Sequence, residues 1–92
     1  MLFAITCLDK PGHGALRQET RPSHLAYLKS FHEQLVLAGP LLSEDGKAPC
    51  GSLLVLDFPD RRSAEAFADG DPYTQAGLFA DVSIRPFRRV LP

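Results

Sequence analysis

The order of strand-like and helix-like stretches constrains the fold of this chain more than any single motif does. Short runs rich in apolar, β-branched and aromatic residues predict strands, and apolar residues at three- and four-residue steps predict helices. Strands are predicted at residues 2–8, 40–43, 52–58 and 81–90, with helices after the first and the third of them. This order, β-α-β-β-α-β, is typical of the ferredoxin-like α+β sandwich, an antiparallel sheet with two main helices on one face.

The first helix is expected to begin within Arg21–Leu28 and to run to about Ala38. Pro22 suits the first turn of a helix, where its missing N–H costs nothing, and Gly39 followed by Pro40 ends the pattern. The apolar stripe consists of Leu25, Leu28, Phe31, Leu35 and Ala38. Residues 15–20 are ambiguous and could add a helical turn. This assignment places His24 in the first turn, where the helix dipole favours the neutral imidazole.

The second half of the chain carries clearer boundary signals. Asp60 or Ser63 can cap a second helix that ends at Gly70. Asp71 and Pro72 then have the residue types of the N-cap and first position of a short helix, which we expect to extend to about Leu78. Pro86 indicates a bulge or an unpaired edge in the last strand.

The third strand predicts how the protein assembles. Leu54, Leu56 and Phe58 alternate with Leu53 and Val55, so both sheet faces receive apolar side chains. Two helices can cover only one face, and right-handed crossovers place them together. We therefore expect a homodimer in which the sheets face each other, as a dimeric α/β barrel. The segment Arg85–Val90 is a candidate for closing the partner's pocket, and an Asp at either Leu54 or Val55 should break the dimer.

The predicted topology brings polar residues that are distant in sequence to one end of the domain. The first helix starts where strand one finishes, and both the polar turn 44–51 and the segment around Asp71 return to that end. We expect His24 to act as a general acid or base, with Asp71 as the carboxylate that orients it. Arg21 and Tyr73 are the expected binders of a substrate or an anion, and Tyr27, nearly one turn beyond His24, could line the same pocket.

Each of these residues also has a purely structural interpretation. A single histidine near a helix start is commonly a surface or capping residue, and Asp before Pro is commonly only a cap. Tyrosines usually pack in the core, and an isolated arginine is usually solvated or paired. Only the convergence of these side chains at one end favours a functional pocket.

Composition excludes several classes of protein. The chain has 92 residues, enough for a single domain spanning residues 1–92, and a net charge of −1 with a sequence pI of about 6.3, so it has no basic field for nucleic acid. No apolar run approaches the roughly 20 residues of a membrane span, and no signal peptide is evident. Cys7 and Cys50 form no disulfide framework, which favours a cytoplasmic protein with reduced thiols.

Metal and cofactor motifs are not expected. His32 lies eight residues after His24, whereas a two-histidine site on one helix face needs a spacing of four. The sequence has no Gly-rich phosphate loop, no zinc pattern of Cys and His, and no Gly-x-Ser-x-Gly motif.

Four segments together resemble the YCII-related family over nearly the whole chain. They are Arg21-x-x-His24-Leu25-x-Tyr27-Leu28, Ala38-Gly39-Pro40-Leu41, Asp45-Gly46 with Gly51-Ser52, and Asp71-Pro72-Tyr73. The resemblance implies a dimeric α/β-barrel fold and matches His24 and Asp71 to the pair proposed as catalytic in the family. One branch is associated with dehydrochlorination of a chlorinated hydroxyhydroquinone, most members have no assigned reaction, and a phosphorylated histidine has been proposed for some.

Two functions follow as hypotheses. The first is a small, cofactor-independent enzyme of the lyase or isomerase type that transfers protons on a small organic acid or phenol. The alternative is a non-catalytic module that binds a small anion in the same pocket. The fold alone does not choose between them.

Overall fold

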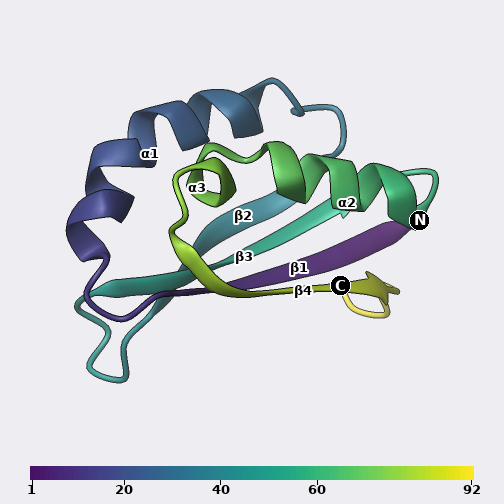
Figure 1. The fold of residues 1–92 in the computed structure, drawn as a ribbon. Coiled ribbons are helices and arrows are strands. Elements are labelled where there is room, and N and C mark those ends of the chain that lie inside the picture. Colours follow the sequence, from purple (N-terminus) through teal and green to yellow (C-terminus); the bar gives the residue numbers. More distant parts are fainter.

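The computed structural model describes residues 1–92 and contains four strands and three helices. Strands β1 (Leu2–Asp9), β2 (Leu35–Leu42), β3 (Pro49–Asp57) and β4 (Phe79–Phe87) form one sheet in the order β2-β3-β1-β4, and every neighbouring pair is antiparallel. Helices α1 (Gly14–Lys29), α2 (Arg61–Gly70) and the short α3 (Pro72–Gln75) lie on one side of this sheet (Figure 1). The predicted ferredoxin-like α+β architecture is therefore confirmed.

The hydrophobic core lies between the helices and the face of the sheet that they cover. Alternate residues of the two central strands point into it, as the period-2 geometry of a strand requires. Those residues are Phe3, Ile5 and Cys7 of β1 and Leu54 and Leu56 of β3, and they pack with Leu28, Phe58, Ala64 and Phe67. None of the three helices combines the length and the apolar character that a membrane crossing requires.

The prediction for the first helix was wrong at both ends. Helix α1 begins at Gly14 and ends at Lys29, and Leu35 and Ala38 belong to β2 instead. Short backbone bonds after the helix, such as Gln34 N–H to the Phe31 carbonyl at 2.9 Å, turn the chain back toward the sheet. Strand β2 is an edge strand that pairs with the largely buried β3 from Leu35 to Leu42, so backbone pairing with β3 outweighs a helical period that residues 35–38 satisfy equally well.

Pro22 consequently lies inside α1 rather than in its first turn. A proline in a helix removes one backbone hydrogen bond, here toward the carbonyl four residues earlier. Both Pro22 and Gln18, which carries that carbonyl, are exposed, so water can take the place of the missing donor. The extra helical turn that residues 15–20 could form is present, and it is part of the same continuous helix.

The boundary signals of the second half were more reliable. The Asp60 side chain caps α2 by accepting from Ser63 N–H at 2.8 Å, and α2 ends at Gly70 as predicted. Asp71 caps α3, with Pro72 at its first position, but α3 ends at Gln75 rather than near Leu78. Strand β4 is an edge strand, which explains how it tolerates Pro86.

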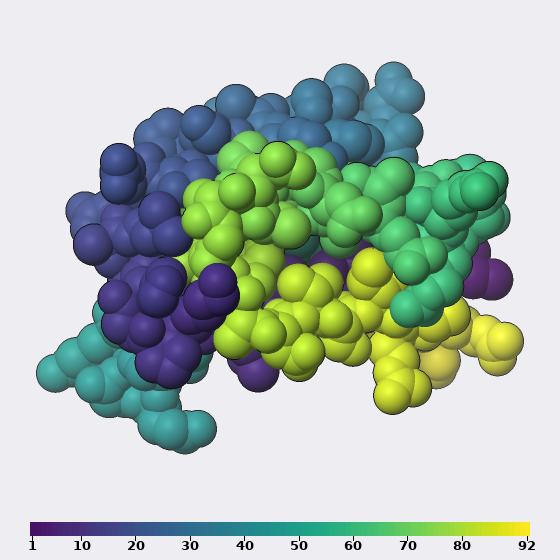
Figure 2. Space-filling model, in the orientation of Figure 1, coloured from purple at the N-terminus to yellow at the C-terminus, as the bar shows by residue number.

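The other sheet face carries no helix and exposes several large apolar side chains. Strand register places Val55 beside Ala4 and Leu37, opposite to the core side, whereas Leu54 is one of the core residues. Leu8, Leu37 and Phe87 of this face are each close to half exposed, at 49%, 48% and 46%. Figure 2 shows that the turn between β2 and β3 protrudes at one end of the molecule, and the chain after β4 at the other.

Candidate functional site

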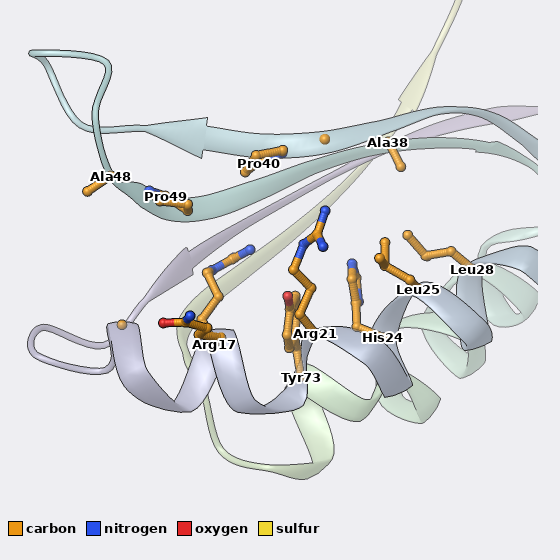
Figure 3. A pocket seen from close by; sticks show the side chains of 13 residues that line it. Arg17, Arg21, His24, Leu25, Leu28, Ala38, Pro40, Ala48, Pro49 and Tyr73 are labelled. Atoms are coloured by element: carbon orange, nitrogen blue, oxygen red, sulfur yellow. The ribbon is translucent and has the colours of Figure 1, made fainter.

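A cavity of about 540 Å³ lies between α1 and the β2–β3 side of the sheet (Figure 3). Helix α1 forms one wall, and the small and cyclic residues of the two strands form the other. The lining residues are Gly14, Arg17, Gln18, Arg21, His24, Leu25, Leu28, Ala38, Gly39, Pro40, Ala48, Pro49 and Tyr73. The volume suits a small organic molecule.

His24 and Asp71 form a buried pair beside this cavity. His24 Nδ1 lies 2.8 Å from Asp71 Oδ1, and the two residues are only 6% and 1% exposed. Because α1 begins at Gly14, His24 is well inside the helix, and the argument from the first-turn dipole does not apply. The carboxylate of Asp71, not the helix terminus, is what orients the imidazole and favours a proton on Nδ1.

Asp71 is itself held rigidly by its capping role. The same Oδ1 atom accepts a hydrogen bond from Tyr73 N–H at 2.9 Å, at the start of α3. Asp71 can therefore act both as a helix cap and as the partner of His24, since one oxygen contacts both the start of α3 and the imidazole. The local turn Asp-Pro-Tyr fixes the carboxylate and the tyrosine ring relative to each other.

Tyr73 lies between His24 and Arg17. Its ring stacks on the imidazole, with centroids 3.9 Å apart and planes inclined by 15°. The guanidinium carbon of Arg17 lies 4.7 Å from the Tyr73 ring centroid, in a cation–π contact. Figure 3 shows Tyr73 between Arg17 and His24, so three flat groups stand side by side at the cavity. We call Arg17, Tyr73 and His24 the polar row.

Arg17 is a buried charge with a complete set of fixed partners on one side. Its Nε and Nη2 donate to the two carboxylate oxygens of Asp9 at 2.7 and 3.0 Å, and Nη2 also donates to Ser52 Oγ at 2.9 Å. Burial opposes the charge of Arg17, but the hydrogen bond and negative charge of Asp9 outweigh it and raise the pKa of Arg17 above its usual value.

Burial also changes the acidity of two neutral groups near the pair. It raises the pKa of the Tyr73 hydroxyl above its ordinary value, so this phenol stays protonated and remains a hydrogen-bond donor. Burial, reinforced by the negative charge of Asp71, raises the pKa of the Cys7 thiol to about 12. The Cys7 thiol is therefore not a nucleophile at neutral pH.

The structure places four of the five expected residues at or beside the cavity and one, Tyr27, away from it. His24, Asp71 and Tyr73 are in mutual contact, and Arg21 lines the cavity from an exposed position on α1. Tyr27 does not line the cavity: its hydroxyl donates to the Phe67 carbonyl at 2.8 Å, and its ring packs against Phe67. Although Tyr27 follows His24 by three residues, its side chain packs toward Phe67 of α2 and away from the cavity.

Sequence reasoning missed Arg17. Arg17, Arg21, His24 and Leu28 recur at steps of four, three and four, which is one helical face. The pattern is present in the sequence, but with the helix start placed within Arg21–Leu28 and residues 15–20 left ambiguous, Arg17 was not included among the candidate site residues. A helix extended to residue 14 would have brought both arginines to the same side as His24.

Fold and site together define the class of protein: a ferredoxin-like α+β domain with a His–Asp pair at a cavity. The chain belongs to the YCII-related family, whose domain model matches residues 1–88. It is 37% identical to protein YciI of Escherichia coli, over 98% of this chain and 99% of that protein. An uncharacterized protein of Haemophilus influenzae is 34% identical with the same coverage.

Solved structures with the same fold include one with a stated reaction. A 5-chloro-2-hydroxyhydroquinone dehydrochlorinase, TftG of Burkholderia phenoliruptrix, in complex with 2,5-dihydroxybenzoquinone, superposes with a TM-score of 0.88 at 33% identity, covering 96% of this chain and 94% of that one. An antibiotic biosynthesis monooxygenase superposes with a TM-score of 0.59 at 13% identity, covering 99% of this chain and all of that one, and shares the fold alone.

Proposed function

We propose that this protein is an acid–base enzyme that moves protons on a small, oxygen-rich cyclic compound without a cofactor, with His24 as the proton-transferring group. The observation that carries the proposal is the geometry of His24. Nδ1 is committed to Asp71, while Nε2 makes no hydrogen bond within the chain and belongs to a residue that lines the cavity. An imidazole fixed in this way can accept a proton at Nε2 and return it.

The relation to TftG supports a hydroxylated aromatic ring as substrate class. Loss of HCl from a chlorinated hydroxyhydroquinone needs only proton transfers. A proton moves from a hydroxyl oxygen to the ring carbon that carries chlorine, and chloride then leaves with the bonding electron pair as a second hydroxyl proton is lost. The product is a hydroxyquinone, and no external oxidant is consumed. A single histidine that alternately accepts and donates a proton is sufficient for both transfers.

Chloride release from 5-chloro-2-hydroxyhydroquinone tests this proposal. His24→Gln should lower the rate by roughly 10²–10⁴-fold, the usual contribution of a positioned acid–base group. His32→Gln is the matched control, because His32 is exposed in the turn after α1 and lies outside the cavity. Wild-type turnover in the His24 variant would sink the assignment of His24, and failure of the wild-type protein to release chloride would exclude this substrate.

A second candidate, binding of a small anion without catalysis, is favoured by the two arginines that line the cavity, Arg17 and Arg21. The two candidates differ in what happens to the bound molecule. Saturable binding of a chlorinated hydroxyhydroquinone that is recovered unchanged after prolonged incubation would support the binding module. Release of chloride at a rate that depends on His24 would support the enzyme.

We also propose a homodimer formed through the open face of the sheet. The motivating observation is the set of apolar side chains that this face exposes without a covering helix, including Leu8, Leu37 and Phe87. A standard interface buries about 800 Å² per partner. Val55 of β3 faces the open side of the sheet, whereas Leu54 faces the core. Val55 is therefore the residue to change in a test of the dimer.

Sedimentation equilibrium checks the assembly. Val55→Asp should shift the protein from dimer to monomer at micromolar concentration, because a charge in an apolar interface lacks a partner. Ala26→Asp adds the same charge to an exposed position of α1 and should leave the dimer intact. A wild-type protein that sediments as a monomer under these conditions would contradict the proposal.

We propose that the protein is cytoplasmic. Both cysteines are free: Cys7 is buried in the core and Cys50 is exposed near the start of β3. Unpaired cysteines are typical of a reducing compartment. Localisation of a tagged full-length chain by cell fractionation tests this, and recovery outside the cytoplasmic fraction would contradict it.

A further inference from the structure

Three polar atoms of the polar row have no partner inside the protein. They are Nη1 of Arg17, the hydroxyl oxygen of Tyr73 and Nε2 of His24, none of which takes part in a hydrogen bond within the chain. Yet every polar side-chain atom that is buried from solvent does have a partner. The three atoms must therefore be accessible, and since all three residues line one cavity, the cavity is where they are reached.

The side chains that carry these atoms are held from behind. Asp9 and Ser52 fix the guanidinium of Arg17, and Asp71 fixes both the imidazole and the backbone of Tyr73. Arg17, His24 and Tyr73 are 7%, 6% and 1% exposed, so each has little freedom to reorient. Groups held in this way bind a ligand without a further loss of side-chain entropy. The row thus presents a cation, a hydroxyl donor and a base in a fixed order.

The charges around the row favour a ligand with a negatively charged oxygen. Arg17 is balanced by Asp9, and its free nitrogen can still donate a charge-assisted hydrogen bond. Arg21 lines the same cavity, is exposed and has no ion-pair partner in the chain, so its positive charge is available to a ligand. The carboxylates of Asp9 and Asp71 are already engaged.

We propose that Arg17 and Tyr73 form an oxyanion subsite, which binds the negative oxygen of a planar enolate, phenolate or hydroxyquinone next to the proton that His24 transfers. The part played by His24 rests on the function proposed above, whereas the anion subsite stands on the geometry of Arg17 and Tyr73. Removing a proton from such a ring leaves negative charge on oxygen. Donors aimed in advance at that charge stabilise it as it develops.

The subsite also sets the substrate class. A neutral ring of the same shape offers only weak acceptors to Arg17, while an ionised hydroxyl meets a guanidinium donor and a phenol donor together. Hydrogen bonds to charged groups are stronger than neutral ones, so ionised ligands should be preferred by roughly 10- to 100-fold. The protein should therefore discriminate by charge among rings of equal size.

Equilibrium binding of two quinones tests the subsite without any turnover. The probes are 2,5-dihydroxybenzoquinone, a vinylogous acid that is ionised at neutral pH, and 2,5-dimethoxybenzoquinone, its uncharged methyl ether. Calorimetry or absorbance should show that the wild-type protein binds the ionised probe at least roughly tenfold more tightly. Arg17→Lys, which keeps the charge but loses the planar fork, and Tyr73→Phe, which removes only the hydroxyl, should each weaken binding of the ionised probe by roughly tenfold or more.

Arg62→Gln is the matched control, because Arg62 is an exposed arginine of α2 outside the cavity, and it should bind both probes as the wild type does. Should Arg17→Lys fail to fold, Tyr73→Phe against this control decides the question. Equal affinity of the wild-type protein for both probes, no binding of the ionised probe, or unchanged binding in Tyr73→Phe overturns the subsite. Since binding is measured apart from chloride release, an inactive His24 variant that still prefers the ionised probe would support the subsite even if the proposed reaction were wrong.

Discussion

The two tyrosines show how differently the cavity and the aromatic core use the same type of side chain. Tyr73 stacks on His24 at the cavity, with its hydroxyl free of any partner in the chain. Tyr27 packs with Phe31 and Phe67 in an aromatic cluster that also includes Phe58, and its hydroxyl is bound to the Phe67 carbonyl. Burial raises the pKa of both hydroxyls. What separates a site from a core here is therefore not burial or acidity but whether the hydrogen bonds are completed inside the protein.

The largest effect should come from breaking the aromatic cluster. Phe67→Ala removes the ring that contacts Tyr27, Phe31 and Phe58, and truncating a buried phenylalanine costs about 3–5 kcal/mol. We expect the free energy of unfolding in urea to fall by that amount. A loss below about 1 kcal/mol would show that the Phe67 ring contributes little to the stability of the core.

At the cavity, Asp71→Asn should act on activity rather than on the fold. Asparagine keeps the size of the side chain and can still cap α3, but it lacks the charge that orients His24. We expect a loss of roughly 100-fold or more in kcat/KM, which corresponds to about 2.7 kcal/mol of barrier. The check is chloride release, with urea unfolding measured alongside. Urea unfolding shows whether a loss of activity in Asp71→Asn reflects a loss of the fold. Asp60→Asn removes the capping carboxylate of α2, serves as the control and should retain activity.

Unfolding at alkaline pH tests the raised pKa of the buried Cys7 thiol. The pKa of the Cys7 thiol rises from 9.0 to about 12 in the folded protein, mainly by burial and then by the charge of Asp71. Between these values the unfolded chain loses the proton while the folded chain keeps it. The free energy of unfolding should therefore fall as pH rises above about 9, by about 1.4 kcal/mol per pH unit for this group. Unfolding at pH 8 and pH 10 should show a smaller drop in Cys7→Ala, and equal drops would contradict the assignment.

The smallest effects give the sharpest comparison. Tyr27→Phe removes a completed hydrogen bond and should cost about 1 kcal/mol of unfolding free energy with kcat/KM unchanged. Tyr73→Phe removes no bond within the protein, so stability should change by less than about 0.5 kcal/mol while kcat/KM falls. Both variants are measured by the same urea unfolding and chloride assays. The opposite pattern, with Tyr27 needed for activity, would contradict the assignment of Tyr73 to the site and of Tyr27 to the core.

Much of the fold could be predicted from the sequence because its boundary signals are local. Asp60, Gly70 and the Asp71-Pro72 pair act through short-range capping geometry, and all three stand where predicted. The start and end of α1 could not be predicted in the same way. Residues 35–38 fit a helix and a strand equally, and only pairing with β3, which is distant in sequence, decides for the strand.

The candidate site was predicted through topology, and its details depend on contacts across the fold. Chain order alone brought His24 and Asp71 to one region, because the direction of each element is fixed once the sheet is antiparallel. The buried position of Arg17 depends on Asp9 and Ser52, which come from two different strands. No local pattern distinguishes such an arginine from a solvated one, and none distinguishes the free hydroxyl of Tyr73 from the bound hydroxyl of Tyr27.

The central claim is that Asp71 holds His24 with Nε2 free to take a proton, and ¹⁵N NMR of the His24 imidazole tests it most directly. We predict that the neutral His24 ring of the free protein carries its proton on Nδ1, toward Asp71, with Nε2 unprotonated, and that Asp71→Asn removes this preference. A neutral ring that carries its proton on Nε2, toward the cavity, would contradict it.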